Sequence, residues 1–160
     1  MRKLWILAVV IQCVVFTGFY VTCAEAQETI QVEMLNRLKK QKMVFNPTIV
    51  EVSLGDTVNW VAKSKGHNVE FFASPQDTKF KSKVSKDVEY TFVESGIYLY
   101  VCTPHASMGM FGVVVVKNEE GLYNLENLEQ VILALESDSK RTRKRLSAIQ
   151  DGIYELIEKK

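Results

Sequence analysis

The stretch that determines the fold of this chain is Ile97–Val116, which reads IYLYVCTPHASMGMFGVVVV. Its two ends, Ile97–Val101 and Phe111–Val116, are dense in β-branched and aromatic residues, a composition typical of buried central strands. The segment Cys102–Met110 between them contains a proline and a glycine, which favour a loop. The stretch therefore predicts two strands joined by a loop that carries a cysteine, a histidine and two methionines.

Residues 28–117 as a whole have the pattern of short strands separated by turns. Val58–Trp60 and Val88–Phe92 alternate apolar and polar residues, as half-buried strands do. Turn signals lie between such segments, at Asn46-Pro47, Gly55-Asp56, Ser74-Pro75 and Ser95-Gly96. Roughly eight strands at this spacing are typical of a β-sandwich. We therefore predict an all-β fold over residues 27–118.

The tail, residues 119–160, has helical periodicity instead. Apolar residues recur every three or four positions, at Leu125, Leu128, Ile132 and Leu135 and again at Leu146, Ile149, Ile153 and Ile157. Ser137–Ser139 offers N-cap residues between the two sets. We predict two C-terminal α-helices packed on the sandwich. The basic run Lys140–Arg145 is interpreted as a solvated helix face, with no role in nucleic-acid binding.

The N-terminal segment is predicted to be a signal peptide over residues 1–26. Arg2 and Lys3 precede the apolar stretch Leu4–Val21, and Ala24-Glu25-Ala26 is a small-x-small cleavage pattern. The alternative is an uncleaved membrane anchor, since the stretch approaches spanning length. Cleavage would leave 134 residues with 18 basic and 18 acidic side chains, because two basic residues and one acidic residue are lost. We expect a periplasmic monomer with no membrane contact after cleavage.

The chain has few histidines and cysteines, and two of them, Cys102 and His105, lie in the predicted loop. His67 and His105 are its two histidines, and Cys102 is the one cysteine outside the predicted signal peptide. A histidine-rich site and a disulfide-dense scaffold are therefore excluded. In an oxidising compartment a lone cysteine is either packed away or bound to something. A single cysteine or histidine is more often structural, but here both occur with a nearby methionine.

This donor set matches one kind of metal centre. Cys102 and His105 are three residues apart, Met110 follows five residues later, and His67 lies 35 residues before the cysteine. A thiolate with two imidazoles and a weak axial thioether is diagnostic of blue copper. We predict one copper ion per chain that cycles between Cu(II) and Cu(I). Cys102 acting as a catalytic nucleophile would leave the methionine without a purpose, so we expect no enzymatic activity.

Longer motifs resemble the cupredoxins, and among them the pseudoazurins. The matching stretches are Met34-Leu-Asn36, Met43-Val-Phe45-x-Pro47, Gly55-Asp-Thr-Val58, Lys65-Gly-His-Asn-Val-Glu70, Phe80-Lys-Ser-Lys83 and Cys102-Thr-Pro-His-x-x-Met-Gly-Met110. The resemblance implies an eight-stranded Greek-key sandwich with copper bound by His67, Cys102, His105 and Met110. Met108 competes for the axial position at a shorter spacing, but the Met-Gly-Met triplet favours Met110.

The resemblance also implies residues that hold the ligands in place, and a docking surface. Asn68 would join the two ligand loops and direct its backbone N–H to the sulfur of Cys102. An apolar patch around His105 would consist of Met43, Pro104, Ala106 and Met108. A ring of lysines would surround it, with candidates Lys39, Lys40, Lys42, Lys63 and Lys65. Such a ring steers acidic partners.

The function implied is that of a periplasmic one-electron carrier. Its donor would be a c-type cytochrome or a dehydrogenase, and its acceptor a terminal reductase such as copper nitrite reductase. The alternative is a copper-binding protein for storage or delivery, which would use the same ligands but hold an exchangeable metal. Cu(II) addition distinguishes the two, because the carrier develops an intense colour that ascorbate bleaches reversibly.

Overall fold

The computed structural model describes residues 26–136 and 140–159. Residues 1–25 of the predicted signal peptide and the predicted cap Ser137–Ser139 lie outside these ranges. Among the described residues, no helix combines the length and the apolar character needed to cross a membrane.

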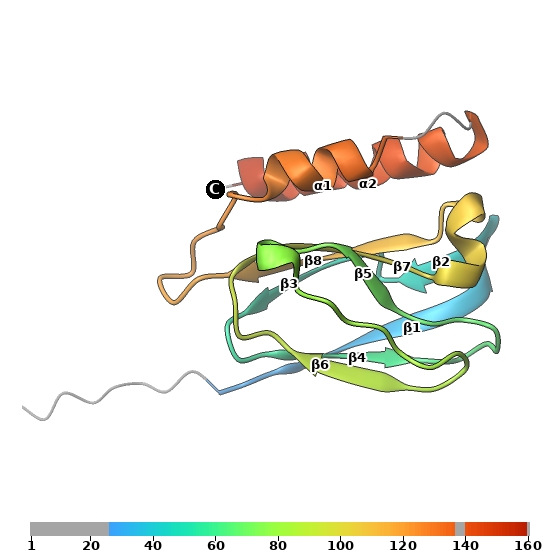
Figure 1. The fold of residues 1–160 in the computed structure, drawn as a ribbon, viewed down its shortest axis with the longest axis horizontal. Helices are drawn as coiled ribbons and strands as arrows, with labels where there is room; N and C mark the ends of the chain where they lie inside the picture. The colour runs from blue at the N-terminus through green and yellow to red at the C-terminus, as the bar shows by residue number, and fades with distance from the viewer. Residues whose placement is uncertain (1–25, 137–139, 160) are drawn as a thin grey trace, which may run out of the picture.

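Two four-stranded sheets pack face to face, with two helices over the outer face of one of them (Figure 1). The strands are β1 (Thr29–Leu38), β2 (Gln41–Asn46), β3 (Ile49–Ser53), β4 (Thr57–Val61), β5 (Glu70–Ala73), β6 (Val88–Thr91), β7 (Gly96–Val101) and β8 (Phe111–Lys117). The first sheet has the order β2-β1-β4-β6 and the second β3-β8-β7-β5. This confirms the predicted sandwich of eight strands.

The sandwich is closed by pairings that cross the sequence. β1 pairs with β4 in parallel, and β3 pairs with β8 in parallel, while the remaining neighbours are antiparallel. β7 and β8 therefore occupy the centre of the second sheet. The loop between them leaves the sheet at one end of the sandwich, next to the turn between β1 and β2 (Figure 1).

Strands β7 and β8 are buried on both faces, which explains their unbroken apolar sequence. Tyr98 and Tyr100 point between the sheets, where Tyr100 packs with Trp60 and Phe45 and Tyr98 packs with Phe71 and Phe92. The intervening Leu99 points the other way, into a second apolar cluster beneath the helices. One strand therefore contributes to two cores, and its residues show no polar alternation.

Gly112 on β8 is required by the ring that faces it. A Cβ added there would lie 2.4 Å from the hydroxyl oxygen of Tyr100, its partner in the β7–β8 register. That ring is fully buried in the core between the sheets. Any larger residue at position 112 would have to displace it.

The helices are α1 (Leu128–Ala134) and α2 (Lys140–Glu158). The apolar face predicted for α2 is confirmed, since Leu146, Ile149 and Ile153 are buried in the cluster under the second sheet. The face predicted for the first helix is confirmed in part, since Leu135 is buried and Leu128 packs against the same cluster. Val131 is the fully buried residue of α1, whereas Leu125 precedes the helix and is exposed. α1 is only seven residues long, so the periodic pattern extended beyond the helix that forms.

Candidate metal centre

The loop after β7 is shaped by backbone hydrogen bonds between its own ends. The short 3-10 helix η2 (Thr103–Met108) follows Cys102, and β8 begins at Phe111. Cys102 N donates to Met110 O at 3.0 Å, and His105 N donates to Cys102 O at 2.9 Å. Gly109 closes the helix with φ of 74°, a left-handed conformation that favours glycine. These bonds bring the cysteine, the histidine and the second methionine back to one end of the sheet.

His67 lies in the loop between β4 and β5, three residues before β5 begins. Its carbonyl accepts a bond of 2.8 Å from Ser85 N, and Gly66 N donates to Ser85 Oγ at 2.8 Å. The segment before β6 therefore fixes this loop. The arrangement confirms that the loop brings His67 to the cysteine, although the two residues are 35 positions apart.

Three donor atoms converge at this end of the sandwich. Cys102 Sγ lies 3.2 Å from His105 Nδ1 and 3.6 Å from His67 Nδ1. The three donors all lie within 4.8 Å of one another. His67 and Cys102 are fully buried, while His105 is partly exposed. Among the described residues, this is the group of histidine, cysteine and acidic side chains placed to hold a metal ion.

The two candidate axial methionines occupy different environments. Met110 is fully buried and belongs to the same core cluster as Cys102. Met108 is partly exposed and lines a surface hollow together with Lys40 and Lys42. An axial ligand must be buried together with the cysteine, so the environment of Met110 fits that role, whereas Met108 lies at the surface.

The imidazole of His67 has its tautomer fixed by Asn36. The Nε2 of His67 lies 2.9 Å from the amide oxygen of Asn36, an acceptor, so Nε2–H is the donor. Nδ1 is then unprotonated, and its lone pair faces the sulfur of Cys102. Burial and the charge of His105 both lower the pKa of His67, which favours this neutral form.

The environment of the Cys102 sulfur combines burial with two backbone hydrogen bonds. Burial raises the pKa of the thiol, and hydrogen bonds from the backbone N–H groups of Asn68 and His105 act in the opposite direction. A soft metal cation would replace the thiol proton and bind the thiolate beside two neutral imidazoles. The donors therefore fit copper, which supplies one-electron redox chemistry when bound.

A chain of hydrogen bonds joins the two ligand loops. Asn68 Nδ2 donates to Thr103 Oγ1 at 3.1 Å, and Thr103 N donates to Asn68 Oδ1 at 2.9 Å. Thr103 Oγ1 in turn donates to Glu70, which pairs with Lys81 at 2.9 Å. The hydrogen bond from Thr103, followed by that from Lys81, lowers the pKa of Glu70. The role expected for Asn68 is confirmed, whereas the extension to Glu70 and Lys81 was not predicted.

The predicted docking residues lie near the partly exposed His105. Pro104 is exposed, and Met43, Ala106 and Met108 are partly buried. A Cβ added at Gly66 would be 3.9 Å from the His105 ring, which places the neighbouring Lys65 close to this surface. The other candidate lysines are exposed as well, namely Lys39, Lys40, Lys42 and Lys63.

The interpretation of the basic run as a solvated face is wrong for one residue. Arg145 is partly buried, and its guanidinium donates to the carbonyls of Lys42, Met43 and Met108. Its neighbours Arg143 and Lys144 are exposed, as predicted. Arg145 belongs to the same run but faces the ligand loop, where three backbone carbonyls accept its hydrogen bonds. No local sequence signal shows this contact, because it spans about a hundred positions.

Comparisons with known proteins agree with this geometry. Residues 32–117 match the family of copper binding proteins described as the plastocyanin/azurin family. Pseudoazurin from Paracoccus pantotrophus is 37% identical over 123 residues, which cover 75% of this chain and 80% of the relative. The crystal structure of pseudoazurin from Methylobacterium extorquens AM1 is 32% identical with a TM-score of 0.67, covering 78% of this chain and 98% of that one. Pseudoazurin from Hyphomicrobium denitrificans has a TM-score of 0.65 at 31% identity, covering 78% and 97%.

The chain belongs to the plastocyanin/azurin family of copper-binding proteins, as its sandwich and its converging cysteine and histidines indicate. It is a type 1 copper protein that transfers electrons and is not an enzyme. Within the family it is pseudoazurin-like, with about one third of its residues identical to those of the pseudoazurins over most of its length. The predicted resemblance and the predicted cofactor are therefore confirmed.

Proposed function

We propose that the chain is a periplasmic one-electron carrier whose copper is bound by His67, Cys102, His105 and Met110. The observation that supports this most directly is the convergence of Cys102 Sγ and the two Nδ1 atoms within 4.8 Å at one end of a rigid sandwich. Asn36 and Asn68 hold the first histidine and the cysteine loop in place before any metal arrives. A preformed site changes little between the two oxidation states, which suits rapid electron transfer.

Electrons enter and leave through the edge of His105. Nδ1 of this ring faces the buried sulfur, whereas the residue itself is partly exposed. The other three proposed ligands are fully buried, so they offer a partner no direct contact. The partly buried Met108 and Ala106 next to His105 provide an apolar contact area that excludes water on docking.

The partner is proposed to be an acidic redox protein, with copper nitrite reductase as the acceptor and a c-type cytochrome or dehydrogenase as the donor. Lys40 and Lys42 line a hollow with Met108, and Lys65 adjoins Gly66 beside the His105 ring. Without the proposed signal peptide the chain has no net charge, so steering depends on this local cluster. Its field acts over about 8 Å at physiological salt.

The division of the chain follows from this function. Residues 1–26 are proposed to direct export and to be removed, residues 27–118 to form the copper-binding sandwich, and residues 119–160 to form the helical extension. Export would deliver Cys102 to an oxidising compartment without another cysteine to pair with, since Cys13 and Cys23 belong to the removed segment.

Stopped-flow electron transfer to copper nitrite reductase tests the proposal. Lys40→Glu and Lys65→Glu should each slow the second-order rate at low salt by about threefold to tenfold and flatten its salt dependence. Lys159→Glu is the matched control, because it makes the same charge change beside Tyr123 and Glu51, at the far end of the second sheet. Equal slowing by all three variants, or none, would show that the docking surface is placed wrongly.

A further inference from the structure

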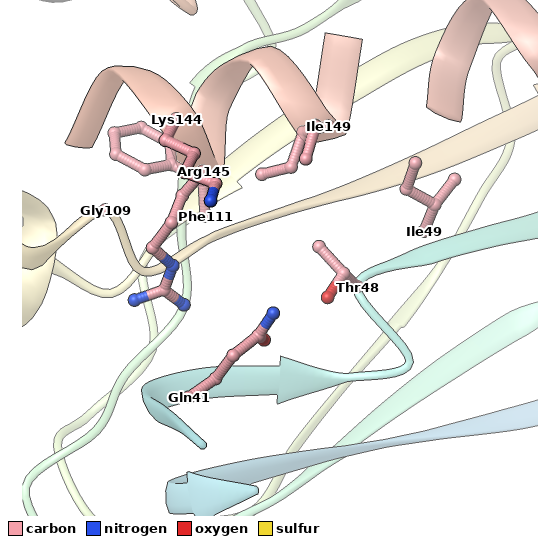
Figure 2. A pocket seen from close by; sticks show the side chains of 9 residues that line it. Gln41, Thr48, Ile49, Gly109, Phe111, Lys144, Arg145 and Ile149 are labelled. Carbon is pink, nitrogen blue, oxygen red and sulfur yellow. The ribbon is translucent and has the colours of Figure 1, made fainter. Parts of the chain in front are cut away.

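Arg145, near the start of α2, reaches down from the helix to two other parts of the chain (Figure 2). Its Nη1 donates to Lys42 O and to Met108 O, both at 2.8 Å. Its Nη2 donates to Met43 O, also at 2.8 Å. The guanidinium therefore holds strand β2 and the loop before β8 together with the helix.

The carbonyls that Arg145 binds belong to residues that have a positive φ or that directly precede such a residue. Met43 has φ of 50°, and Gly109, which follows Met108, has φ of 74°. Both are in the left-handed region, where the chain turns out of its regular pairing. Hydrogen bonds from a charged donor are about twice as strong as neutral ones, and the planar guanidinium presents its N–H groups in a fixed geometry. Arg145 thus stabilises two segments that the sheets alone hold weakly.

Each segment lies close to a proposed ligand or to a residue that holds one. Met108 O is two residues before Met110, and a Cβ added at the intervening Gly109 would lie 3.4 Å from Cδ of Arg145. On the other side, the β1–β2 register pairs Leu35 with Val44 and Arg37 with Lys42, so Met43 lies between partners of the residues that flank Asn36. The side chain of Asn36 accepts the hydrogen bond from His67.

Apolar packing beside this contact is incomplete. A cavity of about 440 Å³ lies between α2, β2 and the start of β3, next to Arg145. Its wall includes Gln41, Thr48 and Gly109, and Figure 2 shows the guanidinium beside Gly109 and above Gln41. The buried Thr142 also approaches Gly109, at 3.6 Å from a Cβ added there, so the helix meets the loop through Thr142 as well as through the hydrogen bonds of Arg145.

We infer that Arg145 is a positioning residue of the copper centre: it fixes the Met108–Met110 segment and so holds Met110 as the axial donor. The inference rests on the proposed ligand role of Met110. Loss of the fork of guanidinium hydrogen bonds to Lys42, Met43 and Met108 lets this segment move. The thioether of Met110 then binds the copper more weakly. A weaker axial donor favours Cu(I) and raises the reduction potential, whereas loss of a nearby positive charge favours Cu(II) and lowers it. The two effects have opposite signs.

Three variants of the full chain separate geometry from charge. Arg145→Lys keeps the charge but not the fork, Arg145→Met removes both, and Lys144→Met removes one charge from an exposed neighbour. The first measurement is backbone amide hydrogen exchange in the copper-free protein. Exchange at Gly109 and Met110 should rise at least about tenfold in both Arg145 variants, as the loss of a charge-assisted bond of about 1.4 kcal/mol predicts. Lys144→Met should leave it unchanged.

The second measurement is the reduction potential of the copper-loaded protein. Arg145→Lys should shift it to a more positive value, and Lys144→Met should leave it unchanged or lower it. The inference is overturned if Arg145→Lys matches the native chain in both exchange and potential, or if Arg145→Met and Lys144→Met shift the potential equally. Failure of the native chain to form a coloured copper site would instead refute the proposed function, while the exchange data would still test the fork.

Discussion

Replacing Asn68 with alanine removes the side chain that joins the two ligand loops. Asn68 is 1% exposed and makes two hydrogen bonds with Thr103, at 2.9 and 3.1 Å. Each is worth about 0.5 to 1.5 kcal/mol net, and the truncation also leaves a small void. Because Thr103 is exposed, water can replace part of the hydrogen bonding that Thr103 loses. We therefore expect the free energy of unfolding of the copper-free protein to fall by about 2 to 3 kcal/mol.

Urea denaturation of the copper-free protein measures this loss, and a double-mutant cycle assigns it. Thr103→Val removes only the hydroxyl, so its coupling with Asn68→Ala should be about 1 kcal/mol, the value of one hydrogen bond. The backbone N–H of Asn68 still reaches Cys102 in the alanine variant, so the colour of the copper-loaded protein should persist. A loss below about 0.5 kcal/mol, or no coupling, would refute the view that this amide joins the loops.

Other parts of the site and the core make separate predictions. Met110→Gln should lower the reduction potential strongly and Met108→Gln only slightly, because an amide oxygen favours Cu(II); voltammetry giving the reverse order would assign Met108 as the ligand. The pKa of His67 is lowered in the folded protein from its ordinary value of 6.5. As the pH is lowered through 6.5, the unfolded chain therefore binds a proton at His67 before the folded chain does, and the free energy of unfolding of the copper-free protein falls. Urea titrations at several pH values should show a smaller loss of unfolding free energy for His67→Asn than for the native chain. An equal loss would show that protonation of His67 is not its cause. Gly112→Ala should destabilise the protein by about 1 to 3 kcal/mol in denaturant, since its Cβ meets Tyr100; an unchanged midpoint would mean that the ring moves freely.

The sequence was most informative where the chemistry is local. Cys102, His105 and Met110 lie in one loop, so their spacing is visible in the sequence. The dense apolar runs of β7 and β8 follow from burial on both faces, which leaves a plain compositional signal. Fold class and cofactor were therefore predicted correctly from residues that act near one another.

The unpredicted features are contacts between distant segments. Arg145 lies about a hundred positions from Lys42 and Met43, and in the sequence it looks like any other member of a basic run. Asn36 is part of a quoted motif, but its bond to His67 depends on a loop that begins 26 residues later, after β4 ends at Val61. Val131 joins the buried face of α1, whereas the periodic Leu125 lies before the helix and is exposed. Each outcome depends on how the elements dock, which periodicity does not specify.

Titration of the copper-free protein with Cu(II), beside a Cys102→Ser variant, tests the central claim most directly. The native chain should develop an intense visible absorption that saturates at one copper per chain, disappears with ascorbate and returns on reoxidation. The serine variant lacks the thiolate and should show neither the intense band nor the reversible cycle. Persistence of both in the serine variant, or a colourless and labile complex in the native chain, would contradict the assignment of Cys102 to an electron-transferring copper site.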